Sequence, residues 1–308
     1  MVVLLLLCAV AGCSEGPAPA PAAAAWREFR NADGSLTAIP RQPRRILSTS
    51  VAITGTLLAI DAPVVASASA SNGEFFAQWQ ALARERHVRN AWPAGSVSLE
   101  AAMAARPDLI VVSTGGADSA LEQLAALRAI APTIVLDYGD QPWEQLALAL
   151  GRATGLEAQA TRRIDAFQRK LVAARARIAV PAGKANLISY NGAGAANPVA
   201  TGRSAQARLL AQLGFAIEEP DPRWQVGRDP RSDFVWAPYE QLSGLQAQTT
   251  FLLRGGDARV AAFLDDPMLA NLPSVRRRQV YALGEDAFRI DYYSACAIVD
   301  RLVRQVGR

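Results

Sequence analysis

The feature that most constrains the fold is a long helical segment between two series of alternating strand and helix patterns. Residues 156–178, LEAQATRRIDAFQRKLVAARARI, place apolar side chains at helical spacing, at Ile164, Phe167, Leu171 and Ile178. A helix of this length measures roughly 34 Å, about the diameter of a domain. The segment therefore predicts a rigid helix that joins two lobes.

The series before this helix predicts a parallel sheet. Apolar strand patterns lie at residues 45–50, 64–69, 109–113 and 133–138. Helical patterns separate them, and Ser50 can cap the helix that follows the first strand. A hairpin around Asp33-Gly34, at residues 26–40, precedes the series. Strands that alternate with helices favour a parallel sheet with helices on its faces.

The series after the long helix repeats this pattern. Strands are expected at residues 185–190, 216–219, 249–253 and 279–283. One helix ends at Gly214, and a final helix at residues 291–306 begins at the capping residue Asp291. We predict an α/β fold of two Rossmann-like lobes joined by a single long α-helix. The expected parts are an N-terminal lobe at 26–141, helices at 142–180 and a C-terminal lobe at 181–308.

The first 25 residues are typical of an export signal followed by a tether. The run MVVLLLLCAVAG is too short to span a bilayer and ends in small residues. Val10-Ala11-Gly12-Cys13 resembles a lipobox, which predicts lipidation at Cys13, and the Pro/Ala-rich residues 17–25 predict an extended tether. A plain signal peptide cut within 18–25 is the alternative. No later segment is long and apolar enough to cross a membrane, so we expect contact with the membrane only through the lipid.

The residue types that support most catalytic and metal sites are scarce. His87 is the only histidine, which argues against a His-based triad and a His-rich zinc site. Cys296 is the only cysteine outside the export signal, so no disulfide framework is expected. The turns at 115–118 and 201–205 fit neither phosphate-loop nor dinucleotide-binding patterns. We therefore expect no catalytic residues, no bound metal, no cofactor and no nucleic-acid partner.

Arginines beside aromatic residues gather in the segments that follow the predicted strands. The formal net charge is +4, and lysine occurs only at positions 170 and 184. Ligands of open α/β sheets bind beyond the carboxyl ends of the strands. Cationic forks and flat apolar faces there suit an anionic aromatic ligand. The loop arginines are Arg86, Arg89, Arg203, Arg223, Arg228, Arg231, Arg254 and Arg289, and the nearby aromatics are Trp92, Tyr190, Trp224, Trp236, Tyr292 and Tyr293.

Four blocks of the sequence resemble the siderophore-binding periplasmic proteins of ABC importers. The blocks are RILSTSVAITGTLLAIDAPVVAS, PDLIVVSTGGADSALEQLAAL, SAQARLLAQLGF and QVYALGEDAFRIDYYSACAIVDRL. The resemblance implies a helical-backbone (type III) binding protein, monomeric and not enzymatic, that captures a ferric siderophore between its lobes and delivers it to an inner-membrane permease. The candidate ligand contacts are Arg89, Trp92, Tyr190, Arg203, Trp224, Arg228, Arg231, Arg289, Tyr292 and Tyr293.

A ferric catecholate of the enterobactin type fits these residues best. Such a complex is a trianion with three flat rings, so several arginine and aromatic side chains could surround it without touching iron. Other ligands on the same fold stay open: haem, a corrinoid, a citrate or hydroxamate siderophore, and bare iron held by Tyr292 and Tyr293. Two other classes of function are an esterase that opens a siderophore lactone and a lipid-anchored sensor or scaffold.

A weak internal repeat places one glutamate in each half of the chain. Glu100 and Glu240 each precede an apolar strand and a Gly-Gly pair, with the same spacing from Glu100 to Gly115 as from Glu240 to Gly255. A carboxylate at a helix start is also favoured by the helix dipole alone. The resemblance implies that such glutamates, one in each lobe, dock on arginines of the permease.

Overall fold

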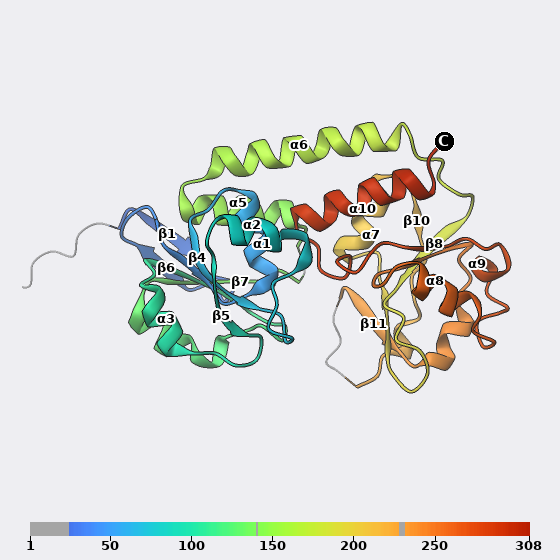
Figure 1. The fold of residues 1–308 in the computed structure, drawn as a ribbon, viewed down its shortest axis with the longest axis horizontal. Helices are drawn as coiled ribbons and strands as arrows, with labels where there is room; N and C mark the ends of the chain where they lie inside the picture. The colour runs from blue at the N-terminus through green and yellow to red at the C-terminus, as the bar shows by residue number, and fades with distance from the viewer. Residues whose placement is uncertain (1–24, 140, 228–231) are drawn as a thin grey trace, which may run out of the picture.

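The computed structural model describes residues 25–139, 141–227 and 232–308, which form two lobes (Figure 1). An antiparallel hairpin of β1 (Arg27–Arg30) and β2 (Leu36–Ile39) opens the chain, with Gly34 at φ 83° in its turn. The Asn31 side chain ties the hairpin to the N-terminal lobe, because its Oδ1 accepts a hydrogen bond of 2.9 Å from the Val135 backbone N–H.

The N-terminal lobe is a five-stranded parallel sheet in the order β5-β4-β3-β6-β7. The sequence predicts a parallel sheet with four of these strands. Its strands are β3 (Ile46–Ser48), β4 (Val64–Ser69), β5 (Arg89–Pro93), β6 (Leu109–Ser113) and β7 (Thr133–Leu136). Its helices are α1 (Val51–Ala59), α2 (Ala77–Glu85), α3 (Leu99–Ala105), the 3₁₀ turn η1 (Leu121–Gln123) and α4 (Leu124–Ile130). Ser50 caps α1 by accepting from the Ile53 N–H.

The C-terminal lobe is a mixed sheet in the order β11-β9-β8-β12-β13, with β10 paired to β8. Its strands are β8 (Lys184–Ile188), β9 (Asn197–Ala200), β10 (Ala216–Ile217), β11 (Phe234–Ala237), β12 (Thr249–Leu252) and β13 (Val280–Ala282). Its helices and turns are α7 (Ala205–Gln212), η2 (Pro222–Trp224), η3 (Tyr239–Gly244), α8 (Asp257–Leu264) and α9 (Pro273–Arg276). Strand β9 is antiparallel to both of its neighbours, so the prediction of a wholly parallel sheet is wrong here.

Three helices lie where the lobes meet. In Figure 1, α6 (Glu157–Arg175) runs along the top of the molecule above both lobes. Beneath it lie α5 (Trp143–Thr154) and α10 (Tyr292–Gln305), and α6 packs against both. Phe167 of α6 is buried in the largest core cluster, which contains residues of both lobes. The predicted helix at 156–178 thus forms over 157–175.

Three segments that were predicted as loops contain strands instead. Residues 89–93 form the edge strand β5, and the segments 190–204 and 220–236 contribute β9 and β11. Strands β5 and β9 lack a continuous apolar run, whereas β11 is apolar throughout but only four residues long. Across the described part of the chain, no helix has both the length and the apolar character that a membrane span requires.

Candidate functional site

A cleft of about 740 Å³ lies between the lobes, at the carboxyl ends of their parallel strands. Its N-terminal wall comes from the residues after β3, β4, β5 and β6, and its C-terminal wall from those after β12 and β13. Strands β3 and β6 are neighbours from which the chain winds in opposite directions, and this is the point where open α/β sheets bind ligands. The cleft is therefore the candidate ligand site.

Two arginines and a phenylalanine lie together in the C-terminal wall of the cleft, beside the acidic residues Glu285 and Asp286. The Arg254 guanidinium lies 4.1 Å from the centre of the Phe288 ring, and that of Arg289 lies 5.1 Å from the same ring. Phe288 stacks on Phe234 behind it, with 5.2 Å between ring centres. We call Arg254, Phe288 and Arg289 the cation stack.

The cation stack has positive charge available for a ligand. Neither arginine of the stack makes an ion pair with any residue that the structure describes. Desolvation, together with the nearby charge of Arg289, lowers the pKa of Arg254. Like charges held this close repel each other, so an anion placed between them is favoured.

The opposite wall carries two aromatic residues among small and polar ones. Phe75 and Phe76 line the cleft from the loop between β4 and α2. Both rest on the buried Trp79, with ring centres 5.1 and 6.3 Å apart. The cleft thus offers aromatic rings on both sides and two arginines on the C-terminal side.

A buried carboxylate holds the N-terminal side of the cleft in place. Asp118 accepts a hydrogen bond of 2.6 Å from the Ser50 hydroxyl and one of 3.0 Å from the Tyr138 hydroxyl. The Tyr138 ring in turn lies 5.8 Å from the Arg289 guanidinium of the other lobe. Gly116, at φ 94°, leaves the space for this arrangement, because a Cβ there would collide with the Tyr138 hydroxyl and the Asp118 carboxylate.

The start of α10 is also anchored across the lobes. Asp291 caps α10 by accepting from the Tyr293 and Ser294 N–H groups, and Gln78 of α2 donates to the same carboxylate at 3.2 Å. Desolvation raises the pKa of Asp291 to about 6. Gly55 of α1 is necessary for this contact, since a Cβ there would collide with the Asp291 carboxylate.

The structure brings Arg289 of the predicted contacts into the cleft lining. Arg203 lies in the exposed turn between β9 and α7, and it does not belong to the lining. Arg228 and Arg231 lie outside the described residues, as does the predicted lipidation site Cys13.

Arg89 and Trp92 do not reach the cleft. Arg89 is the first residue of β5, at the end of the strand away from the cleft, and it donates to the Ala104 carbonyl at 3.1 Å. Trp92 is buried in the core on one side of the sheet. Both were assigned to a loop, whereas a strand directs alternate side chains into the core and fixes its first residue at the far end of the sheet.

The predicted tyrosines pack within the protein. Tyr190 donates to Asp266 at 2.5 Å, and burial together with this bond raises the pKa of Tyr190. Tyr292 packs edge-on against Trp143, with 5.4 Å between ring centres. Tyr293 is partly buried beside it, and desolvation raises the pKa of Tyr293 to about 12. None of the three lines the cleft.

The remaining predicted residues lie on the outside of the lobes. Trp224 packs against Gly244 in the C-terminal lobe. Glu100 is exposed in the first turn of α3, which Ser98 caps, and Glu240 is exposed in the first turn of η3. The two glutamates thus occupy matching places before β6 and β12.

Phe75, Phe76 and Phe288 are cleft residues that the sequence reasoning missed, and Arg254 was noted only among the loop arginines. Their positions in the sequence could have identified two of them, because Arg254 closely follows β12 and Phe288 directly precedes Arg289. Among the described residues there is no group of three or more His, Cys, Asp and Glu side chains that could hold a metal ion.

Comparison with known proteins agrees with this architecture. Residues 46–287 match the family of periplasmic binding proteins. The chain belongs to that family. The chain is 40% identical over 291 residues to the ferric enterobactin-binding periplasmic protein FepB of Escherichia coli O6:H1, and the match covers 91% of each chain.

Two solved structures extend the comparison. The crystal structure of holo-ViuP is 54% identical, with a TM-score of 0.90, and the match covers 92% of this chain and 96% of that one. The triscatecholate siderophore binding protein FeuA from Bacillus subtilis, complexed with ferri-bacillibactin, has a TM-score of 0.67 at 16% identity, covering 90% and 98%. The second likeness shows the fold alone. The predicted family and the two-lobed α/β fold are confirmed.

Proposed function

We propose that this periplasmic binding protein captures a ferric catecholate siderophore of the enterobactin type and delivers it to the permease of an ABC importer. The cation stack in the cleft carries the proposal. Arg254 and Arg289 offer charge to a trianion, and Phe288 offers a flat face to a catechol ring. The similarity to FepB supports the same ligand class.

The charges of the cleft favour one placement of the ligand. Glu74 and Glu285 are exposed lining carboxylates, and Glu74 accepts a hydrogen bond from Gln80. Glu74 on the N-terminal wall repels a trianion and the stack attracts it, so the ligand lies against Arg254 and Arg289, with Glu285 beside them as an unfavourable neighbour. Phe75 and Phe76 then close over its apolar rings from the other side.

Quenching of intrinsic fluorescence by a ligand panel tests the ligand class. Ferric enterobactin, a neutral ferric hydroxamate, ferric citrate, haem and cobalamin are titrated in parallel. We expect ferric enterobactin to bind most tightly. Tighter binding of haem or cobalamin would refute a catecholate as the ligand and would identify the tighter-binding compound class instead.

We propose binding without catalysis. Incubation of the protein with ferric enterobactin, followed by chromatography of the products, is expected to return the intact lactone. Accumulation of the opened ester would instead identify an esterase. Bare iron is expected to bind weakly or not at all, because the Tyr292 and Tyr293 rings pack against neighbouring aromatic groups.

We propose that Glu100 and Glu240 dock the protein on the permease. Both carboxylates are exposed at the start of matching turns, and neither has an ion-pair partner among the described residues. Exposed pairs of this kind mainly set orientation and association rate. The double variant Glu100→Ala, Glu240→Ala should keep its siderophore affinity and melting temperature but lose most uptake. Normal uptake by cells with only this variant would refute docking through these residues.

We also propose that Cys13 carries a lipid that anchors a monomer in the periplasm. The apolar run and the Pro/Ala tether that follows support this arrangement. Cys13→Ser should abolish lipid labelling and release the protein into the soluble fraction. A mature protein that begins at another residue, by mass spectrometry, would contradict the proposal.

A further inference from the structure

The loop of residues 283–291 holds two members of the cation stack, Phe288 and Arg289. The loop joins β13 to α10 and forms no strand or helix of its own. Its backbone polar groups therefore need partners elsewhere in the protein. Any movement of this loop would displace the stack from the cleft.

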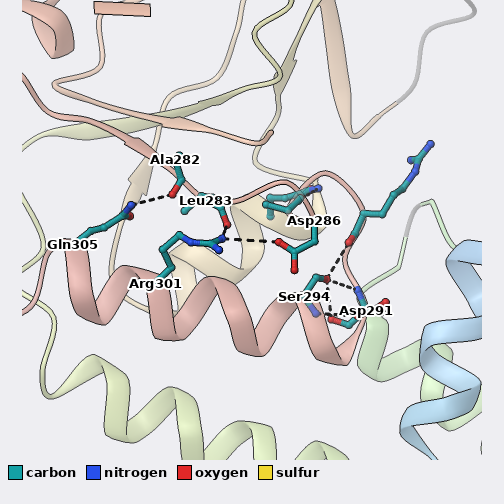
Figure 2. A network of polar contacts seen from close by, with 10 residues as sticks. Ala282, Leu283, Asp286, Asp291, Ser294, Arg301 and Gln305 are labelled. Carbon is teal, nitrogen blue, oxygen red and sulfur yellow. Dashed lines mark hydrogen bonds and ion pairs between the residues drawn. The ribbon is translucent and has the colours of Figure 1, made fainter. Parts of the chain in front are cut away.

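Gln206 of α7 supplies two of these partners, donating to the Ala287 carbonyl at 3.1 Å and to the Phe288 carbonyl at 2.8 Å. Helix α10 supports both ends of the loop from one of its faces (Figure 2). Near its end, Gln305 donates to the Ala282 carbonyl at 3.0 Å. Arg301, one turn earlier, donates to the Leu283 carbonyl. At the start of the helix, Ser294 donates to the Arg289 carbonyl at 2.9 Å.

Arg301 makes the central contact of this network. Besides the Leu283 carbonyl, its guanidinium lies 3.9 Å from the Asp286 carboxylate, and both side chains are partly buried. Gly284 leaves room for the guanidinium, because a Cβ there would collide with it. The backbone of Gly284 also has φ 110°, a conformation that other residues rarely adopt. Arg301 and Gly284 therefore fit together as a pair.

We propose that Arg301 is a positioning residue for ligand capture. Its guanidinium fixes loop 283–291 on α10, so that Phe288 and Arg289 are in place before the ligand arrives. Ordering side chains in advance removes an entropic cost from binding. The inference rests on the proposed function for its effect on affinity, but the fixing of the loop does not depend on which ligand binds.

The variant Arg301→Ala tests this proposal, with Arg304→Ala as the control. Arg304 is exposed on the same helix, and its loss changes the net charge equally. Two measurements are made well below the melting temperature: amide hydrogen exchange of peptides covering 283–291, and the dissociation constant for ferric enterobactin. Methylguanidine is then added to refill the space left by Arg301. Arg301→Met, which keeps the aliphatic stem, replaces the alanine variant if the latter does not fold.

We expect faster exchange in the loop of the Arg301 variant and about tenfold weaker binding, since two side chains must then be ordered during binding. Added methylguanidine should restore part of the exchange protection and part of the affinity. A variant that had only lost overall stability would not respond in this way. Parent-like exchange and affinity in the Arg301 variant would overturn the proposal. If the parent protein does not bind ferric enterobactin, the proposed function fails, whereas the exchange comparison still decides whether Arg301 fixes the loop.

Discussion

Replacement of Arg289 by alanine removes one cation from the cleft and leaves its surroundings intact. The guanidinium lies 5.1 Å from the Phe288 ring centre and 5.8 Å from that of Tyr138, so it reaches across to the opposite lobe. It has no ion-pair partner among the described residues, and its removal leaves no buried carboxylate unpaired. The variant should therefore fold normally.

The expected effect on affinity follows from one charge-assisted contact with the ligand. Such a contact contributes about 1.5–3 kcal/mol, so Arg289→Ala should weaken binding of ferric enterobactin roughly 10- to 150-fold. Arg289→Lys should fall between the parent and the alanine variant, because an ammonium keeps the charge but lacks the planar fork. Calorimetric titration measures both dissociation constants.

Arg89→Ala is the matched control, because it removes the same charge at the far end of β5. At an ionic strength near 0.1 M, charges more than about 10 Å away are largely screened, so this variant should bind like the parent. An unchanged dissociation constant for Arg289→Ala would remove Arg289 from the site. Equal losses in both variants would show that overall charge, not contact, governs affinity.

Two further predictions concern the residues that support the cleft. Gly116→Ala should destabilise the fold by about 1–3 kcal/mol, because alanine at φ 94° is strained and its Cβ collides with Tyr138, whereas Gly115→Ala, which has open space, should be nearly neutral in thermal unfolding. Burial raises the pKa of Asp291 to about 6, so the folded protein favours the protonated carboxyl more than the unfolded chain does. The stability that Asp291 contributes in this way is fully present below the unfolded pKa of about 3.9. It is lost as the pH rises through 6. Asp291→Asn has no carboxyl to ionise, so its free energy of unfolding should rise relative to that of the parent as the pH increases from 4 to 7. Denaturant titrations at each pH measure this difference. A difference that stays constant across the range would contradict the raised pKa of Asp291.

The central parallel strands, such as β6 and β12, were predictable because their apolar runs are buried on both faces. Strand β6 forms over the predicted residues 109–113, and Ser50 and Asp291 cap the helices that they were expected to cap. Strand β5 carries little apolar signal, since Trp92 is its one buried residue. Strand β9 contains Pro198, which lacks an N–H and does not look like a strand residue in the sequence.

The candidate site was harder to predict because a sequence does not show where a side chain points. Arg289 was placed correctly beyond β13, since the loop after a parallel strand opens on the cleft. Tyr292 follows three residues later, yet its ring packs on Trp143. The pairing of Arg254 with Phe288 depends on β12 and β13 being neighbours, which only the sheet order reveals.

Comparison of the affinities for a trianionic and a neutral ferric complex tests the central claim, which is that the cation stack selects a ferric catecholate. The dissociation constants of ferric enterobactin and of a neutral ferric hydroxamate are measured by calorimetry at low and at high salt. Because the trianion is held by charge, it should bind more tightly than the neutral complex and should lose part of this advantage at high salt. Tighter binding of the neutral complex, or an affinity for ferric enterobactin that salt does not change, would contradict the account.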